Sequence, residues 1–246
     1  MKRTVLRVDG ADHRKFLQDL VTNNLGGLDR GLVYAGLLTP QGKYLFDFFL
    51  IPADGAIWID VAADRAQALG QRLTMYRLRA DVAIAPMDVV VTRGFGPAPE
   101  GAFADPRLRA LGWRAYGAQM PSSDDAGEWD ALRVAHCVPE TGVELIADQS
   151  YILECGFERL NGVDFRKGCY VGQEVTARMK HKTELKKGLV TVGVEGAAPV
   201  GTDIDAGGKA AGALFTQADG QGIAYLRFDR AKGLMTAGDA VVRRLD

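Results

Sequence analysis

The chain has 246 residues, of which 47% are hydrophobic, and this is enough to bury the cores of one to three domains. Lysine and arginine total 30 and aspartate and glutamate total 31, so the net charge of −1 argues against a protein that binds polyanions over much of its surface. The three cysteines, Cys137, Cys155 and Cys169, include no closely spaced pair. This spacing argues against a disulfide framework and indicates a reducing cytoplasm.

Neither a targeting segment nor a membrane span is expected. The first residues run directly into a charged stretch and lack the long apolar run of a secretory signal. The most apolar region, residues 45–63, contains a predicted turn and is interrupted by Asp47, Asp54 and Asp60. We therefore expect this region to form strands inside a globular core and not to cross a bilayer.

The first 43 residues are predicted to form a strand, a helix and a second strand. Residues 4–8 read as a short strand, and residues 11–21 as a helix with one apolar face. That face consists of Phe16, Leu17, Leu20 and Val21. A strand at 31–39 and a hairpin turn at 40–43 are expected next.

Residues 43–120 are expected to form a lobe of their own. Two strands are followed by a helix that begins near residue 63, and two further strands come after that helix. This order is typical of a split β-α-β lobe. The predicted strands are 44–51, 56–61, 81–85 and 89–93.

The second half contains a predicted linker, a helix and a set of short strands. Residues 120–127 are polar and form the expected linker, and the helix that carries Trp129 is predicted to end before Val138-Pro139. The last 59 residues are rich in glycine and contain short apolar runs separated by turn residues. They predict a small antiparallel barrel or sandwich.

The segment 167–174, with the sequence Lys-Gly-Cys-Tyr-Val-Gly-Gln-Glu, carries the strongest functional signal. Gly168 and Gly172 allow tight backbone turns on both sides of Cys169. If a helix begins at Gln173, its dipole and the nearby Lys167 favour a reactive thiolate. The structural alternative is a glycine-bounded turn with a buried cysteine that acts as a small hydrophobic residue.

This segment resembles the signature of the YgfZ family. Those folate-binding proteins are related to the glycine-cleavage T-protein, an aminomethyltransferase, and act in iron–sulfur cluster assembly and maintenance. The resemblance extends over nearly the whole chain. Further similar segments are 8–12, 16–23, 38–43, 132–140 and 160–165.

The resemblance implies an α+β, T-protein-like fold with three lobes around a central cavity that holds tetrahydrofolate. Residues 1–42 and 121–186 would form a discontinuous folate-binding lobe. Residues 43–120 would be the inserted split β-α-β lobe, and residues 187–246 the C-terminal β-barrel.

The resemblance also suggests which side chains do the chemistry. Cys169 is the expected functional thiol, Lys167 a neighbouring charge, and Asp47 an acid that faces the folate amine. Trp129 is expected to form part of the pterin wall, although an ordinary core tryptophan on an amphipathic helix fits its position equally well. The remaining expected folate contacts are Tyr170, Gln173, Glu174 and Arg178.

Two positions differ from the T-protein pattern. Phe46-Asp47 stands where the T-protein has two adjacent aspartates, and Ala135 stands where it has a glutamate that binds the pterin. Leaving a buried pterin donor without its acceptor costs about 1–3 kcal/mol. Both differences argue against aminomethyl transfer and predict weaker folate binding.

The sequence therefore predicts a folate-binding accessory protein for the assembly or repair of iron–sulfur proteins, with iron–sulfur client or assembly proteins as partners. One alternative is a tetrahydrofolate-dependent aminomethyltransferase, and another is a protein linked to tRNA modification. The near-zero net charge argues against direct nucleic-acid binding. The cysteines and His136 and His181 lack ligand-like spacing, so no permanent metal site is predicted.

Overall fold

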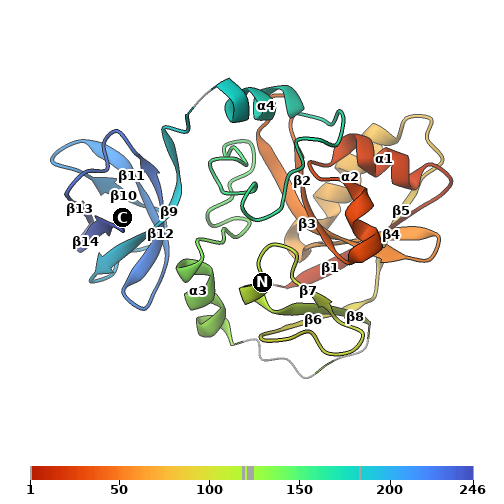
Figure 1. The fold of residues 1–246 in the computed structure, drawn as a ribbon, viewed down its shortest axis with the longest axis horizontal. Coiled ribbons are helices and arrows are strands. Elements are labelled where there is room, and N and C mark those ends of the chain that lie inside the picture. The colour runs from red at the N-terminus through yellow and green to blue at the C-terminus, as the bar shows by residue number, and fades with distance from the viewer. Residues whose placement is uncertain (1, 118–119, 121–124, 183, 246) are drawn as a thin grey trace. The chain divides into compact units, whose positions relative to one another are not determined.

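A computed structural model describes residues 2–245, except for 118–119, 121–124 and 183. The chain divides into two compact units (Figure 1). The first unit comprises Met1–Asp124 and Glu158–Val175, and the second comprises Asp125–Phe157 and Thr176–Asp246. Half of the linker predicted at 120–127, residues 121–124, lies outside the described residues, and Ala126 and Gly127 already belong to a helix.

The first unit is built on a five-stranded sheet with the order β2-β3-β4-β1-β5, in which all neighbouring strands are antiparallel. The helix α2 (Ala66–Arg77) connects β4 to β5, and β1 lies between these two strands. The strands are β1 (Arg3–Asp9), β2 (Val33–Leu38), β3 (Tyr44–Ala53), β4 (Ala56–Ala62) and β5 (Ala83–Met87).

A split β-α-β arrangement is therefore present, but its middle strand comes from the start of the chain and not from within residues 43–120. The predicted boundary at 42/43 falls inside the hairpin that joins β2 and β3 of one sheet. The pattern of apolar residues predicts that a segment is a strand, but it does not predict which other strands pair with it. The three-lobe boundaries stay a prediction.

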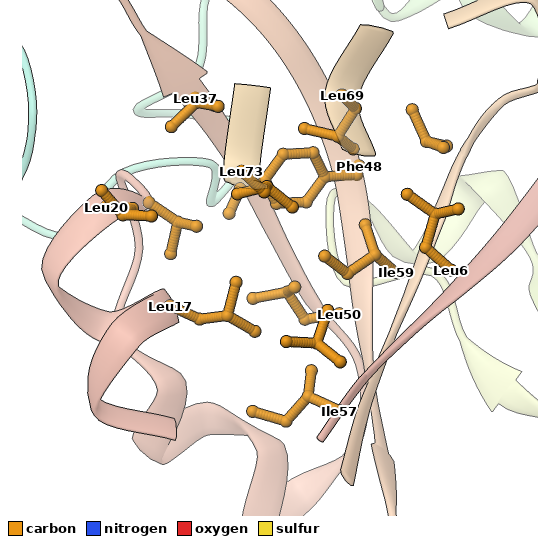
Figure 2. Close-up of a cluster of buried hydrophobic side chains, with 14 of the residues drawn as sticks. Leu6, Leu17, Leu20, Leu37, Phe48, Leu50, Ile57, Ile59, Leu69 and Leu73 are labelled. Atoms are coloured by element: carbon orange, nitrogen blue, oxygen red, sulfur yellow. The ribbon is translucent and has the colours of Figure 1, made fainter. Parts of the chain in front are cut away.

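One face of this sheet is covered by helices. The helix α1 (His13–Leu20) contributes Leu17 and Leu20, and α2 contributes Leu69 and Leu73, to a cluster that faces the sheet (Figure 2). The strands contribute side chains that include Leu6, Phe48, Leu50, Ile57 and Ile59. Each fully buried side chain of this size contributes about 1.5–3 kcal/mol. The predicted apolar face of α1 therefore packs on the core as expected.

A charged layer links this sheet to a second, three-stranded sheet with the order β6-β8-β7. Asp60 on β4 accepts hydrogen bonds from Arg3 (2.6 Å), Arg114 (3.3 Å) and Tyr116 (2.9 Å). The guanidinium carbon of Arg114 lies 3.9 Å from the ring centroid of Phe49. The strands of the second sheet are β6 (Val90–Gly94), β7 (Phe103–Ala104) and β8 (Trp113–Gly117).

Asp105 extends this layer. It binds Arg107 at 2.8 Å and Arg114 at 3.4 Å, and all three side chains are buried. Burial alone raises the pKa of the Asp105 carboxyl, but the charges and hydrogen bonds of Arg107 and Arg114 outweigh it and hold this pKa below its ordinary value. A buried charge is tolerated only when it is paired in this way.

The second unit contains a closed six-stranded barrel with the order β10-β11-β12-β9-β14-β13. The C-terminal barrel predicted from the glycine-rich pattern is confirmed. The helix α3 (Ala126–Ala135) packs against β11 and β12. The strands are β9 (Lys187–Glu195), β10 (Thr202–Asp205), β11 (Ala210–Ala218), β12 (Gln221–Arg227), β13 (Leu234–Ala237) and β14 (Ala240–Arg244).

The remaining elements are the helix α4 (Gln173–Lys182) and three short 3₁₀ turns, η1 (Leu25–Arg30), η2 (Ala63–Arg65) and η3 (Arg109–Leu111). Within the residues that the structure describes, no helix is both long enough and apolar enough to span a bilayer.

Asp60 provides a test of the charged layer. We expect Asp60→Ala to lower the free energy of unfolding of the first unit by about 3–5 kcal/mol, because it leaves buried arginines without their counter-charge. The matched change Asp64→Ala, at an exposed position four residues away, should stay within about 0.5 kcal/mol. Urea unfolding of both variants measures the difference, and equal effects would contradict the role of Asp60.

Candidate functional site

The chain that leads into the 167–174 segment is attached to the end of α1 by buried hydrogen bonds. The hydroxyl of Thr22 donates to the carbonyl oxygen of Gly162 (2.6 Å), and the Asp164 amide donates to the Thr22 carbonyl (3.1 Å). The Asn23 side chain donates to the carbonyl of Asn161 at 2.6 Å. Residues 161–164 are therefore fixed in position although they belong to no helix or strand.

Lys167 is buried, with 4% of its surface exposed. Its Nζ donates hydrogen bonds to the carbonyl oxygens of Gln18 and Val21, at the C-terminal end of α1. The last carbonyls of a helix have no partner within the helix, and the negative end of the helix dipole favours a cation there. Lys167 therefore attaches the segment to α1.

The environment of Lys167 alters its proton affinity. Burial lowers the pKa of its amine to about 8, although the charges of Asp19 and Asp164 act in the opposite direction. The sequence suggested a charge beside the thiol. In the structure the amine is directed into the helix end, and spacing alone could not reveal this contact because Gln18 lies 149 residues away.

On the C-terminal side of Cys169, Tyr170 and Val171 hold the segment in place. Tyr170 is buried, and the Nζ of Lys167 lies 5.2 Å from its ring centroid. Val171 packs against the core of the first unit. Two buried side chains, Lys167 and Tyr170, thus flank Cys169 along the chain.

Gly168 and Gly172 require the absence of a side chain for different physical reasons. Gly168 has a φ of +63°, and a Cβ there would meet no atom within 4 Å. Gly172 has a φ of +82°, and a Cβ there would lie 2.5 Å from the carbonyl oxygen of Thr39. Gly168 therefore permits a left-handed turn, whereas Gly172 also permits close packing of the segment on the β2–β3 hairpin.

Cys169 is the exposed cysteine of the three, whereas Cys137 and Cys155 are buried. Burial raises the pKa of the Cys155 thiol to about 12, so that this group stays protonated at neutral pH. The thiol of Cys169 is thus presented to solvent from a segment whose neighbouring side chains are held in the core.

The helix α4 begins directly after this segment. The Gln173 amide donates to the Tyr170 carbonyl at 3.2 Å. The side chain of Gln173 is half-buried, whereas Glu174 and Arg178 are exposed. Their expected contacts with folate stay predictions.

Asp47 is buried on β3 and accepts hydrogen bonds from two phenols. Tyr34 donates to Oδ2 at 3.1 Å and Tyr44 donates to Oδ1 at 2.8 Å. Burial and the nearby Asp47 carboxylate raise the pKa of Tyr34 well above its ordinary value, so its hydroxyl stays a donor at neutral pH. The sequence analysis missed both tyrosines, which alternation within a strand does not distinguish from core residues.

Trp129 is buried on α3 and belongs to the second unit, whereas Asp47 belongs to the first. The expectation that both border one folate cavity stays a prediction. No group of three or more His, Cys, Asp and Glu side chains in the described part of the chain is arranged to hold a metal ion.

Comparisons with known proteins identify relatives over most of the chain. Residues 186–245 match the family model described as CAF17, C-terminal beta-barrel domain. The chain is 32% identical over 235 residues to the iron-sulfur cluster assembly factor IBA57 homolog, mitochondrial, of Neurospora crassa, and this match covers 80% of the chain and 54% of that protein. It is 30% identical to iron-sulfur cluster assembly factor IBA57, mitochondrial, of Mus musculus, over 94% of the chain and 77% of the mouse protein.

The human protein of the same name is also 30% identical, with the same coverage of 94% and 77%. The chain spans about half the length of the fungal relative and more of the two mammalian ones. Among solved structures, the glycine cleavage system aminomethyltransferase T from Bartonella henselae superimposes with a TM-score of 0.73 at 13% identity, over 99% of this chain and 83% of that one.

These findings confirm the predicted T-protein-like α+β fold with a C-terminal barrel. The YgfZ assignment is confirmed only in part, because the relatives are IBA57 proteins and the T-protein shares the fold. The predicted cytoplasmic location is wrong, since these relatives are named mitochondrial. The spacing of the cysteines argues against a disulfide framework, but it does not distinguish between one reducing compartment and another.

The two glycines allow a matched test of the segment. We expect Gly168→Ala to lower the free energy of unfolding by about 1–2 kcal/mol, the cost of a left-handed backbone for alanine. Gly172→Ala should cost at least twice as much, because its Cβ also collides with the Thr39 carbonyl. Chemical unfolding of both variants measures the two losses of unfolding free energy. A smaller loss at Gly172 than at Gly168 would contradict the described packing.

Proposed function

Because the chain belongs to the family of the IBA57 proteins, we propose that it is an iron–sulfur cluster assembly factor and that Cys169 is its functional thiol. The observation that carries this proposal is the exposed Cys169 between the buried side chains of Lys167 and Tyr170. Such an arrangement presents one sulfur at a defined position and excludes the other two cysteines from the surface.

The chemistry of the thiol supports a role with iron. A cysteine thiolate is the usual ligand of iron–sulfur clusters, which take four protein ligands. Within the described residues no group of three ligating side chains exists, so Cys169 supplies one ligand and the carrier or client protein supplies the others. The Cys169 thiol gives its proton to solvent, and its thiolate displaces one carrier thiolate from an iron of the cluster. The displaced carrier thiolate takes up a proton, so no oxidation or reduction is needed, and the cluster is cargo and not a resident cofactor.

The folate part of the proposal rests on different residues. Tetrahydrofolate would meet the carboxylate of Asp47, whereas a contact of the pterin with the indole of Trp129 stays an expectation from the resemblance. Phe46 is part of the hydrophobic core, and the guanidinium carbon of Arg65 lies 5.0 Å from its ring centroid. This position therefore has a packing role in place of a second carboxylate. We propose binding of folate with lower affinity than in a T-protein, without efficient aminomethyl transfer.

Removal of the thiol tests the assembly role. A cluster-loaded scaffold protein is mixed with a cluster-depleted [4Fe–4S] enzyme, and recovery of enzyme activity is followed with and without this protein. We expect Cys169→Ala to abolish the acceleration, because the sulfur ligand is lost. The matched variant Cys137→Ala removes a buried thiol and should retain it. Full acceleration by Cys169→Ala would contradict the proposal.

Folate binding has its own measurement. Titration with tetrahydrofolate should change tryptophan fluorescence in the wild type, and Asp47→Asn should weaken binding by roughly tenfold, or about 1.4 kcal/mol. The aminomethyltransferase alternative predicts a different result. Turnover of an aminomethylated carrier at about 1–10 per second, abolished by Asp47→Asn but unaffected by Cys169→Ala, would favour that alternative. The tRNA-linked alternative stays a prediction.

A further inference from the structure

The strand pairing brings many of the cations of the barrel toward one of its ends. Arg227 pairs with Lys187, Leu234 with Arg243, and Asp205 with Ala210. The starts of β9, β11 and β13 and the ends of β10, β12 and β14 therefore lie at one end of the barrel (Figure 1). We call this the basic end, formed by residues 186–187, 205–210, 227–234 and 243–244.

The distribution of charge between the ends is unequal. The lysines and arginines of residues 186–246 lie toward the basic end, where several of them meet carboxylates. Asp205 and Asp229 lie among them, Glu154 lies 3.9 Å from Lys187, and Glu195 pairs with Arg243 at 3.0 Å. At the opposite end lie Asp219 and Asp239, in the turns that join β11 to β12 and β13 to β14. The cations of the basic end are Lys186, Lys187, Lys209, Arg227, Arg230, Lys232, Arg243 and Arg244.

The surface of the basic end is hollowed in two places. One hollow of about 710 Å³ is lined by Lys232, Leu234, Arg243 and Arg244, together with small residues. A second hollow of about 680 Å³ is lined by Lys209, Asp229, Arg230 and Lys232 with Ala206. Lys232 borders both hollows, so they are neighbours on the surface of the barrel.

Several of these cations are held in place by the barrel itself. Arg230 donates to the Ala210 carbonyl at 2.9 Å, and the guanidinium carbon of Arg244 lies 5.3 Å from the ring centroid of Phe228. Leu234, which lines the first hollow together with Arg244, is 65% exposed. The basic end thus combines positioned positive charges with one exposed large apolar side chain, a combination of arginine-rich and apolar contacts found at protein interfaces.

We propose that the basic end of the barrel binds an acidic surface of a partner protein. The inference rests on the proposed assembly function and deepens it by giving the chemistry of the partner surface. Charge complementarity speeds association and selects among partners. An acidic protein surface offers carboxylates for the cations and apolar side chains for Leu234.

The same features disfavour a nucleic acid. Single strands bind where exposed aromatic rings stack on bases, whereas Phe228 is stacked by Arg244. Asp205 and Asp229 lie among the cations and would repel a uniform run of phosphates. A protein surface carries charges of both signs, so it can pair with the cations of the basic end and also with these two carboxylates.

The test uses a fluorescent peptide of repeated Glu-Glu-Leu units and measures its binding by anisotropy. The double variant Lys209→Glu, Lys232→Glu should raise the Kd by more than about tenfold. The matched double variant Lys2→Glu, Lys15→Glu, which makes the same charge change at exposed positions of the first unit, should leave it nearly unchanged. High salt should weaken binding of the wild type.

Leu234→Ser separates the apolar contact from the charges. It should weaken binding of the Glu-Glu-Leu peptide but not that of an all-glutamate peptide of the same charge. Three results would overturn the proposal: no binding of the peptide, equal weakening by both double variants, or tighter binding of a single-stranded RNA of the same length at this end. Because the assay involves no cluster, such a failure leaves the role of Cys169 untouched, and the reactivation assay tests that role separately.

Discussion

The candidate site depends on the burial of one amine at the end of one helix. Lys167 satisfies two carbonyls at the C-terminal end of α1 that would otherwise lack partners, and in return it holds the segment that carries Cys169. Burial of a cation is costly and lowers the pKa of Lys167 to about 8, so this contact persists only because the surrounding core enforces it. The exposed thiol is a consequence of that constraint.

The two units contribute different physical properties. In the first unit, one face of the sheet packs apolar side chains and the other face carries paired charges. This sheet provides a rigid support for the cysteine segment. In the second unit, the closed barrel brings Lys209, Arg230 and Lys232 together around one hollow. A single sulfur ligand cannot retain a cluster, so a protein that acts through Cys169 needs a surface that recruits the other ligands. The proposed binding of an acidic partner surface at the basic end of the barrel would meet that need.

Local patterns predicted the elements, and long-range contacts escaped prediction. The apolar face of α1 and the short strands of the barrel followed from residues a few positions apart. The insertion of β1 between β4 and β5, the contact of Lys167 with Gln18, and the pairing of Tyr34 with Asp47 did not. These depend on which segments meet in the fold, and a single sequence carries no signal for them.

Hydrogen exchange tests most directly whether Lys167 holds the cysteine segment. Amide exchange is measured by mass spectrometry on peptides from residues 161–172 and from the barrel, in the wild type and in Lys167→Met. Faster exchange in 161–172 of the variant, with unchanged exchange in β9 to β14, is the result that this account predicts. Unchanged exchange in 161–172 would contradict it, because the segment would then keep its conformation without the contact between Lys167 and α1.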